Sequence, residues 1–286
     1  MIQKAVQQIM LGTVTRNENE TRATLSAIRA AGYDGIELNG FMIRKTPLLV
    51  RLLTKAAGMP TGGGADYDWP GLLKEAGLCV VSIHEDLGGI RRDPDAILKE
   101  AEKFQTDYVV ITGMYRFDYA DPAQVHALAA DLNEGGRKLK EGGVQLLYHN
   151  HNCEFLKLRG EGKRAYDVLL EETDPDAVNF ELDSYWPTEA GVDALALMKQ
   201  LGTRMKLWHV NDRGTRVKEG PIMTPILKSD SMELGYGNMN LTALAQQARE
   251  AGIHAAVLES HRNWAEKSPV KSLQLSAPFL LEQFGE

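Results

Sequence analysis

The sequence predicts an α/β protein built as a closed barrel of eight parallel strands, the (β/α)8 or TIM barrel. Short apolar runs alternate with helical stretches along the 286 residues, a pattern typical of βα units and a parallel sheet. There are eight strand-like runs, and eight favours closure into a barrel. An open doubly wound sheet is the alternative. Against it, no GxGxxG turn follows the first run, where such sheets often bind a dinucleotide.

The predicted strands are short and apolar, and helix-length segments separate them. They lie at residues 4–11, 34–40, 78–87, 107–114, 144–151, 178–186, 205–213 and 255–261. Polar starts and glycine stops mark helices at residues 17–32, 93–106, 121–143, 192–202, 240–252 and 270–284. We expect one domain over residues 1–286, with inserted loops at about 41–71 and 213–240.

Both inserted loops follow strands, so on a barrel both would emerge at the C-terminal face. Long loops in compact domains are usually lids, partner surfaces or disordered spans. The first loop contains the run Gly62-Gly63-Gly64, which invites a phosphate-binding interpretation. No Lys-Ser/Thr follows the run and no strand directly precedes it, so a flexible lid tip is the better interpretation.

Composition narrows the class of protein and its partners. Hydrophobic residues at 43% and charged residues at 25% are typical of a globular protein with a sizeable core. The net charge of -7 leaves no basic stripe for nucleic acid. No run approaches the ~18 apolar residues that a membrane span needs. The start lacks the pattern of a signal peptide, and the 2 cysteines suggest no disulfide framework, so we expect a cytoplasmic protein.

Histidines and acidic residues stand at the ends of the apolar runs, as in LLYHNH, VNFELD, KLWH and AAVLE. The carboxyl ends of barrel strands meet at one face, so these side chains should line a single pocket of oxygen and nitrogen atoms. Chance rarely places such residues at the ends of most strands while the strand bodies stay apolar. The residues concerned are Glu37, His84, His149, His151, Asp183, His209 and Glu259.

Taken singly, each of these residues is ambiguous. His149 and His151 share one face of their strand, about 7 Å apart, but both could be hydrogen-bonded core histidines. Asp183 could be a turn residue, although a buried carboxylate is costly unless it is paired or bound to a cation. Glu154 follows shortly after and could fold back to the same rim. Trp186 could form a wall against a sugar face or simply pack.

Carboxylates and imidazoles without a cysteine ligand suit Mn²⁺, Mg²⁺, Co²⁺ or Zn²⁺. Such a cation would bind adjacent hydroxyl and carbonyl oxygens of a substrate and acidify the C–H beside the carbonyl. A neighbouring base could then remove that proton. Its return elsewhere gives isomerisation or epimerisation, whereas loss of a β-leaving group gives elimination. Both outcomes need largely the same residues, so both stay open.

The chain resembles the sugar phosphate isomerase/epimerase superfamily, whose members are xylose isomerase-like TIM barrels. The resemblance covers about residues 32 to 264 and rests on GYDGIELNG, YHNHNCEF, ELDSYW followed by EAGVD, WHVND and LESH. It implies a single divalent metal, with Mn²⁺ favoured, held at the ends of strands five to eight. The matched ligand positions are Asp183, His209 and Glu259.

The chain departs from the resemblance at strand five, where many relatives have a glutamate ligand and this sequence has His149. Either His149 binds the metal or Glu154 reaches back to supply the carboxylate. We favour Glu154, which leaves His149 and His151 for proton transfer. From their positions at or just after the strand ends, we also expect Glu37, His84, Trp186 and His261 to line the pocket and bind the substrate.

The activity implied is enolisation of a carbohydrate carbonyl by a metal-dependent isomerase or epimerase. Loss of the strand-five glutamate weakens the two-base epimerase mechanism and favours a lyase, such as an inosose-type dehydratase or a C-glycoside deglycosidase acting on 3-oxo-glycosides. Deglycosidases work with a small β partner, so we expect a homo-oligomer or a hetero-oligomer of that kind. The competing class is a metal-independent, endonuclease-like or sugar-binding relative without this catalysis.

Overall fold

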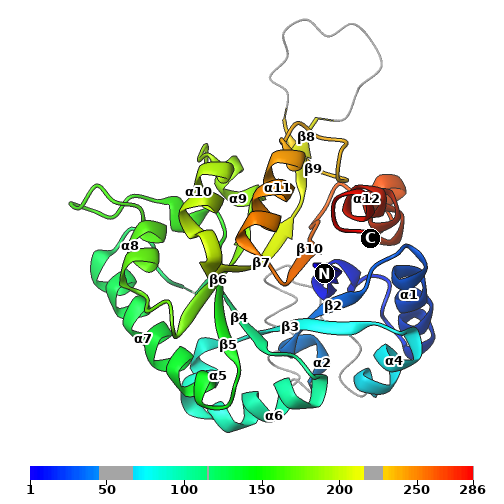
Figure 1. Cartoon of the computed structure of the whole chain (residues 1–286), viewed down its shortest axis with the longest axis horizontal. Coiled ribbons are helices and arrows are strands. Elements are labelled where there is room, and N and C mark those ends of the chain that lie inside the picture. The colour runs from blue at the N-terminus through cyan, green and yellow to red at the C-terminus, as the bar shows by residue number, and fades with distance from the viewer. Residues whose placement is uncertain (45–66, 115, 216–227, 286) are drawn as a thin grey trace, which may run out of the picture.

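The computed structural model describes residues 1–44, 67–114, 116–215 and 228–285. Eight parallel strands close into a barrel in the order β1-β10-β7-β6-β5-β4-β3-β2. Helices surround this barrel (Figure 1). The prediction of a (β/α)8 barrel is therefore confirmed, and the open doubly wound sheet is excluded.

Every barrel strand lies within or overlaps one of the predicted apolar runs. The strands are β1 (Gln3–Gln7), β2 (Gly35–Asn39), β3 (Cys79–Glu85), β4 (Tyr108–Thr112), β5 (Gln145–His149), β6 (Val178–Asp183), β7 (Met205–Val210) and β10 (Ala255–Leu258). A separate antiparallel ribbon pairs β8 (Asp212–Gly214) with β9 (Asp230–Met232).

The helices of the outer layer follow the barrel strands in sequence. They are α1 (Glu18–Ala30), α2 (Gly40–Ile43), α4 (Trp69–Ala76), α5 (Leu87–Arg92), α6 (Pro94–Phe104), α7 (Pro122–Glu141), α8 (Ala165–Glu172), α9 (Tyr185–Glu189), α10 (Ala194–Leu201), α11 (Leu241–Ala251) and α12 (Pro269–Phe284). Short 3-10 turns are η1 (Gln8–Leu11), η3 (Cys153–Phe155), η4 (Gly202–Arg204) and η5 (Ala265–Lys267). Within the described segments, no helix is both long and apolar enough to cross a bilayer.

Local sequence explains where the long helices begin. Asp93 and Asp121 each precede a proline, and their carboxylates accept hydrogen bonds from the free backbone N–H groups of α6 and α7. The amide oxygen of Asn17 does the same for α1. At the other end of α11, Gly252 adopts φ +71°, a left-handed conformation that glycine tolerates best. With signals of this kind, the bounds of the six predicted helices agree with the observed bounds to within a few residues.

The structure corrects the sequence analysis in three places. The predicted strand at 178–186 ends at Asp183, because Tyr185 and Trp186 begin α9. The first predicted strand is too long, because the amide oxygen of Gln7 accepts a hydrogen bond from Ile9 N at 2.7 Å and the chain turns into η1. The β8–β9 ribbon was not foreseen. It is anchored by the buried carboxylate of Asp212, which accepts hydrogen bonds from three backbone N–H groups of residues 235–239. Residues 216–227 and the Gly62-Gly63-Gly64 run lie outside the described residues.

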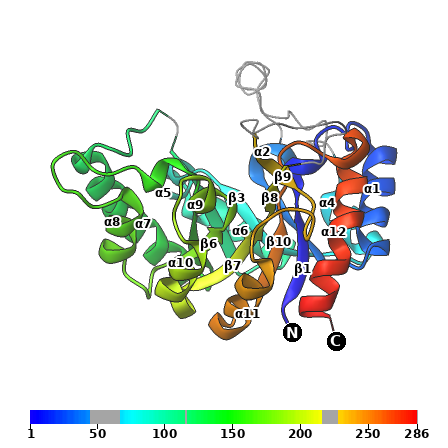
Figure 2. The ribbon, with the colours of Figure 1, turned by 90° about the horizontal axis from the view of Figure 1, so that it is seen from above.

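Alternation along the strands creates two hydrophobic layers. Outward side chains pack beneath the helices, and α1 and α12 lie side by side there (Figures 1 and 2). Inward side chains form a small apolar floor inside the barrel: Ala5, Val81, Val110, Leu147, Leu207, Ala255 and Val257. Two residues beyond Leu147, Leu207 and Val257, the inward positions become polar, which places a polar layer directly above the apolar floor.

Candidate metal centre and active site

Four side chains from separate strands meet at the carboxyl end of the barrel, and we call them the rim group. They are His149 at the end of β5, Asp183 at the end of β6, His209 in β7 and Glu259 just after β10, and each offers a ligand atom within 4.8 Å of the others. Asp183 and His209 are direct neighbours in the β6–β7 register. All four are buried. The structure thus brings together Asp183, His209 and Glu259, as the sequence analysis expected.

A second group of possible ligands lies beside the first and shares two of its members. It consists of His84, His149, Glu181 and His209, whose ligand atoms also lie within 4.8 Å of one another. Glu37 adjoins this group, with its Oε2 atom 3.0 Å from His84 Nε2 and 2.5 Å from His209 Nε2. We call these five residues the inner group.

The two carboxylates of the rim group differ in how strongly their surroundings favour the charged form. Burial and the neighbouring Glu259 raise the pKa of Asp183 well above its usual range. Burial would also raise the pKa of Glu259, but His261 and His209 outweigh it and hold that pKa well below its usual range. A divalent ion between the two carboxylates would stabilise both in their charged form. Two imidazoles and two carboxylates are a donor set that suits Zn²⁺, Mn²⁺ or Co²⁺.

The inner group is held together by charge as well as by hydrogen bonds. Burial alone would lower the pKa of His84, but Glu37 and Glu181 outweigh it and raise that pKa to about 10. Burial would raise the pKa of Glu181, yet His209 and His149 bring it well below its usual range. Glu181 and the ring of His84 therefore support each other's charged forms inside the barrel, whereas burial and His209 lower the pKa of His149.

Glu154, the ligand favoured from sequence, lies in the turn η3 and belongs to neither group of ligand atoms. Its Oε1 atom accepts a hydrogen bond from Tyr148 Oη at 2.9 Å, and its Oε2 atom accepts one from His151 N at 2.9 Å. The residue is fully buried. These contacts hold the carboxylate against β5 and its following turn. Ligation by Glu154 stays a prediction, and His149 is the strand-five residue that lies in the rim group.

His151 stands beside the rim group without belonging to it. Its ring centroid is 5.1 Å from that of His149 and 5.5 Å from that of Trp186. Burial and His149 together lower the pKa of His151 to about 4, so the ring is neutral near pH 7 and can accept a proton. The role of His151 in proton transfer stays a prediction.

The predicted substrate-binding residues fall in two different places. Trp186 and the more exposed His261 lie together, with ring centroids 5.6 Å apart, and His261 Nε2 is 3.6 Å from Glu259 Oε2. Both line a cavity of about 200 Å³ together with Tyr185, Asn211, Ser231 and Arg262. Glu37 and His84 instead lie in the inner group and contact protein atoms. Direct substrate contact by those two residues remains a prediction.

Glu181 is the site residue that the sequence analysis did not assign. The available signal was strand alternation, since Glu181 stands two residues before Asp183 and so faces the same side of β6. Its partners could not be read from sequence, because His84, His149 and His209 come from three other strands.

The chain belongs to the family of xylose isomerase-like TIM barrels, whose family model matches residues 25–281. Its fold is also similar to that of a solved sugar phosphate isomerase/epimerase from Parabacteroides distasonis, with a TM-score of 0.74 at 19% identity over 98% of each chain. That likeness shows the fold.

Curated relatives are similar to part of the chain. An inosose dehydratase of Mesomycoplasma hyopneumoniae strain J is 32% identical over 202 residues, which are 66% of this chain and 61% of the relative. An inosose dehydratase of Clostridium perfringens is 34% identical over 93 residues, 32% of this chain and 30% of the relative. The chain therefore spans at most about three fifths of the length of these relatives.

Proposed function

We propose that this protein is a divalent-metal-dependent enzyme that enolises a keto sugar or keto-cyclitol and then expels a β-hydroxyl group as water. One observation carries the proposal: four ligand atoms converge at the carboxyl end of the barrel beside a histidine that is not among them. Working groups of barrel enzymes lie at this face. The similarity to inosose dehydratases supports elimination as the outcome.

In this proposal the residues divide into those that hold the cation and those that move protons. His149, Asp183, His209 and Glu259 would hold the ion, which when bound polarises a carbonyl oxygen and acidifies the neighbouring C–H. His151 takes the proton from that carbon at a ring nitrogen. The β C–O bond then breaks, and the departing hydroxyl receives a proton from His151 or His261 and leaves as water.

The substrate would lie against the ring wall formed by Trp186 and His261. The indole Nε1 of Trp186 is buried and has no hydrogen-bond partner among the described residues. An N–H without a partner is costly to bury, and a hydroxyl oxygen of a polyol could accept its hydrogen bond. Together with the adjacent cavity of about 200 Å³, this supports a hydroxylated substrate of modest size.

A second candidate function is isomerisation or epimerisation of the same kind of substrate. The observation that favours it is the presence of two imidazoles, His151 and His261, near the ring of Trp186, with ring centroids 5.5 and 5.6 Å away. One ring could remove a proton and the other could return it. Release of an aglycone from a 3-oxo-glycoside is the further variant, in which the leaving group is not water.

Three substrates separate these outcomes. Metal-loaded protein is incubated in D₂O with a keto-cyclitol, a free ketohexose and a 3-oxo-glycoside, and the products are followed by NMR and mass spectrometry. Loss of water from the keto-cyclitol supports the proposal. Deuterium uptake with a changed stereocentre but no loss of mass supports the epimerase, and aglycone release supports the deglycosidase. If the wild-type protein and the D183A variant both fail to react with any of the three substrates, all three candidate functions are contradicted.

Narrower predictions from sequence belong to the same proposal. Mn²⁺ is the favoured ion, and elemental analysis of protein purified without added metal checks it. Assembly as a homo-oligomer, or with a small β subunit, is checked by light scattering of the purified protein and of its native complex. The cytoplasmic location is checked by cell fractionation.

A further inference from the structure

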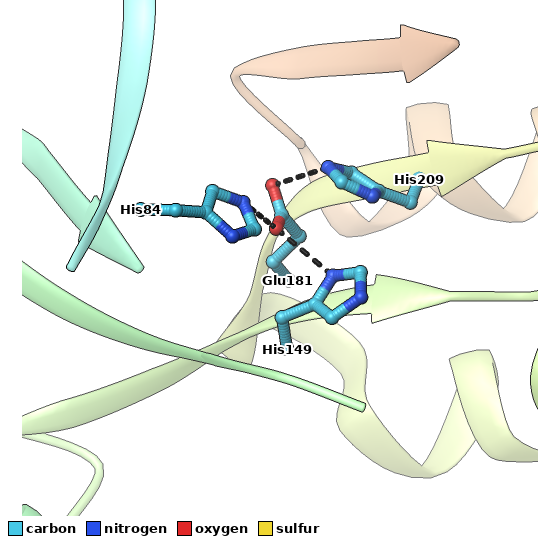
Figure 3. Close-up of side chains that lie close together, drawn as sticks. All are labelled: His84, His149, Glu181 and His209. Carbon is cyan, nitrogen blue, oxygen red and sulfur yellow. Dashed lines mark hydrogen bonds and ion pairs between the residues drawn. The ribbon is translucent and has the colours of Figure 1, made fainter. Parts of the chain in front are cut away.

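Glu181 lies at the centre of three histidines inside the barrel (Figure 3). Its Oε2 atom is 3.1 Å from both His84 Nε2 and His149 Nδ1, at hydrogen-bond distance from each. Its Oε1 atom is 3.1 Å from His209 Nε2. The carboxylate is completely buried, so these three rings are the groups that offset the cost of removing its charge from water.

Glu37 completes the arrangement from the neighbouring side of the barrel. Its Oε2 atom is 2.5 Å from His209 Nε2, and its Oε1 atom accepts a hydrogen bond from Ser82 Oγ at 2.5 Å. The hydroxyl of Ser82 thus fixes one oxygen of Glu37 and leaves the other for His209. Two buried glutamates therefore face the same nitrogen of His209.

The two nitrogens of His209 face different partners. Nε2 faces Glu37 and Glu181, whereas Nδ1 lies 2.9 Å from Glu259 Oε2, in the rim group. In His149 it is Nδ1 that bonds to Glu181, which leaves Nε2 as the nitrogen free for a metal. A carboxylate that accepts the proton of one imidazole nitrogen fixes the ring so that the other nitrogen can bind a cation.

We infer that Glu181, with Glu37, is a positioning residue that orients His149 and His209 so that Nε2 of the first and Nδ1 of the second face the rim group. This inference rests on the proposed metal in the rim group. The inference goes beyond the proposed function because it names the nitrogen of each histidine that binds the metal and the residue that decides this choice.

A second cation in the inner group is the competing explanation. Simultaneous occupation of both groups would require His149 and His209 to give both of their nitrogens to metals. Each of those inner nitrogens already has a carboxylate oxygen within 3.1 Å. These contacts supply the inner nitrogens with partners without an ion, so we assign the inner group a supporting role.

The first test compares Glu181→Gln with Glu85→Gln. Glu85 is also a glutamate at a strand end, and its side chain is only 5% exposed, but its partner is Arg44 and not a histidine. Glu181→Gln replaces one carboxylate oxygen by an N–H donor and removes the negative charge that faces the three rings, so zinc affinity, measured by competition with a chromogenic chelator, should fall about 10–100-fold. Glu85→Gln should keep wild-type affinity. Equal affinity of the E181Q variant and the wild type would overturn the inference.

The second test needs no variant. In zinc-loaded wild-type protein labelled with ¹⁵N-histidine, long-range ¹H–¹⁵N spectra should show His149 protonated at Nδ1 and His209 protonated at Nε2. Zinc bound through His149 Nδ1 or His209 Nε2 would overturn the inference. The inference would also be overturned if the wild-type chain bound two zinc ions and the E181Q variant only one, because Glu181 would then be a ligand. A wild-type protein that binds no divalent ion would refute the proposed function as well.

Discussion

Two histidines in this protein contact carboxylates at similar distances but in opposite surroundings. His209, inside the barrel, has Glu37 and Glu259 oxygens at 2.5 and 2.9 Å. His126, on the outer surface of α7, has Glu172 and Glu161 oxygens at 2.8 and 3.3 Å. The side chain of His209 is 0% exposed, and that of His126 is 41% exposed.

The difference shows that burial, more than distance, decides how much such contacts contribute to stability. Water screens the surface group, so pairs of this kind contribute about 0.2–1 kcal/mol to stability. In the barrel, removing one partner would leave a charge without compensation in a dry interior, which is strongly destabilising. A protein built for stability alone would gain little from so many buried charges. Their presence at the rim is therefore best explained by binding a cation.

The largest effect is expected from the carboxylates of the rim group. Asp183→Ala or Glu259→Ala should abolish tight binding of divalent metal, because each removes a charged ligand from the group of four. Circular dichroism should show the fold retained, although its stability falls, since both residues lie outside the apolar floor but are buried. Elemental analysis measures the bound metal, and His126→Ala is the matched control. Unchanged metal content in the D183A and E259A variants would show that the ligand set is wrong.

Substitution of the two strand-five histidines should separate binding from proton transfer. His149→Ala should lose metal, because His149 lies in the rim group. His151→Ala should keep the metal and lower turnover by ~10²–10⁴-fold, the usual contribution of a general base. Turnover and metal content are measured on the same samples. Metal loss from H151A, or full metal content in H149A, would reverse the two assignments.

Glu154→Ala tests whether the buried carboxylate in η3 is structural or a ligand. The change leaves Tyr148 Oη and His151 N without their acceptor, so the free energy of unfolding should fall by about 1–3 kcal/mol. Metal affinity should stay near that of the wild type, because Glu154 is outside both groups of ligand atoms. Denaturant titration measures the first quantity and chelator competition the second. A large loss of affinity with little change in stability would make Glu154 the strand-five ligand.

The smallest effect belongs to the surface group. Hydrogen bonds from His126 to Glu172 and Glu161 raise the pKa of His126 above its ordinary value. A raised pKa in the folded state means that the contribution to stability is present below the unfolded-state pKa of about 6.5 and is lost as pH rises through the folded-state pKa. His126→Ala should therefore cost at most about 1 kcal/mol at pH 5.5 and less at pH 9. Urea titrations at both pH values check this, and a larger cost at pH 9 would contradict it.

Much of the architecture could be predicted because the relevant signals are local. Eight apolar runs separated by helical segments give the barrel, and capping residues such as Asp93 and Asp121 mark the helix starts. Alternation also places His149, Asp183, His209 and Glu259 on the inward face at the ends of their strands. The β8–β9 ribbon escaped prediction, because its two short strands pair across a long segment and are anchored by the distant contacts of Asp212.

The sequence by itself determined which residue types stand at the mouth of the barrel and on which face of each strand they lie. Only the tertiary structure decided which partners these buried residues contact. Glu154 contacts Tyr148, and Glu181 is surrounded by histidines of β3, β5 and β7. The physical reason is that strand alternation is a local property of the backbone. The partner of a buried charge, in contrast, depends on the closure and register of strands that are far apart in the chain.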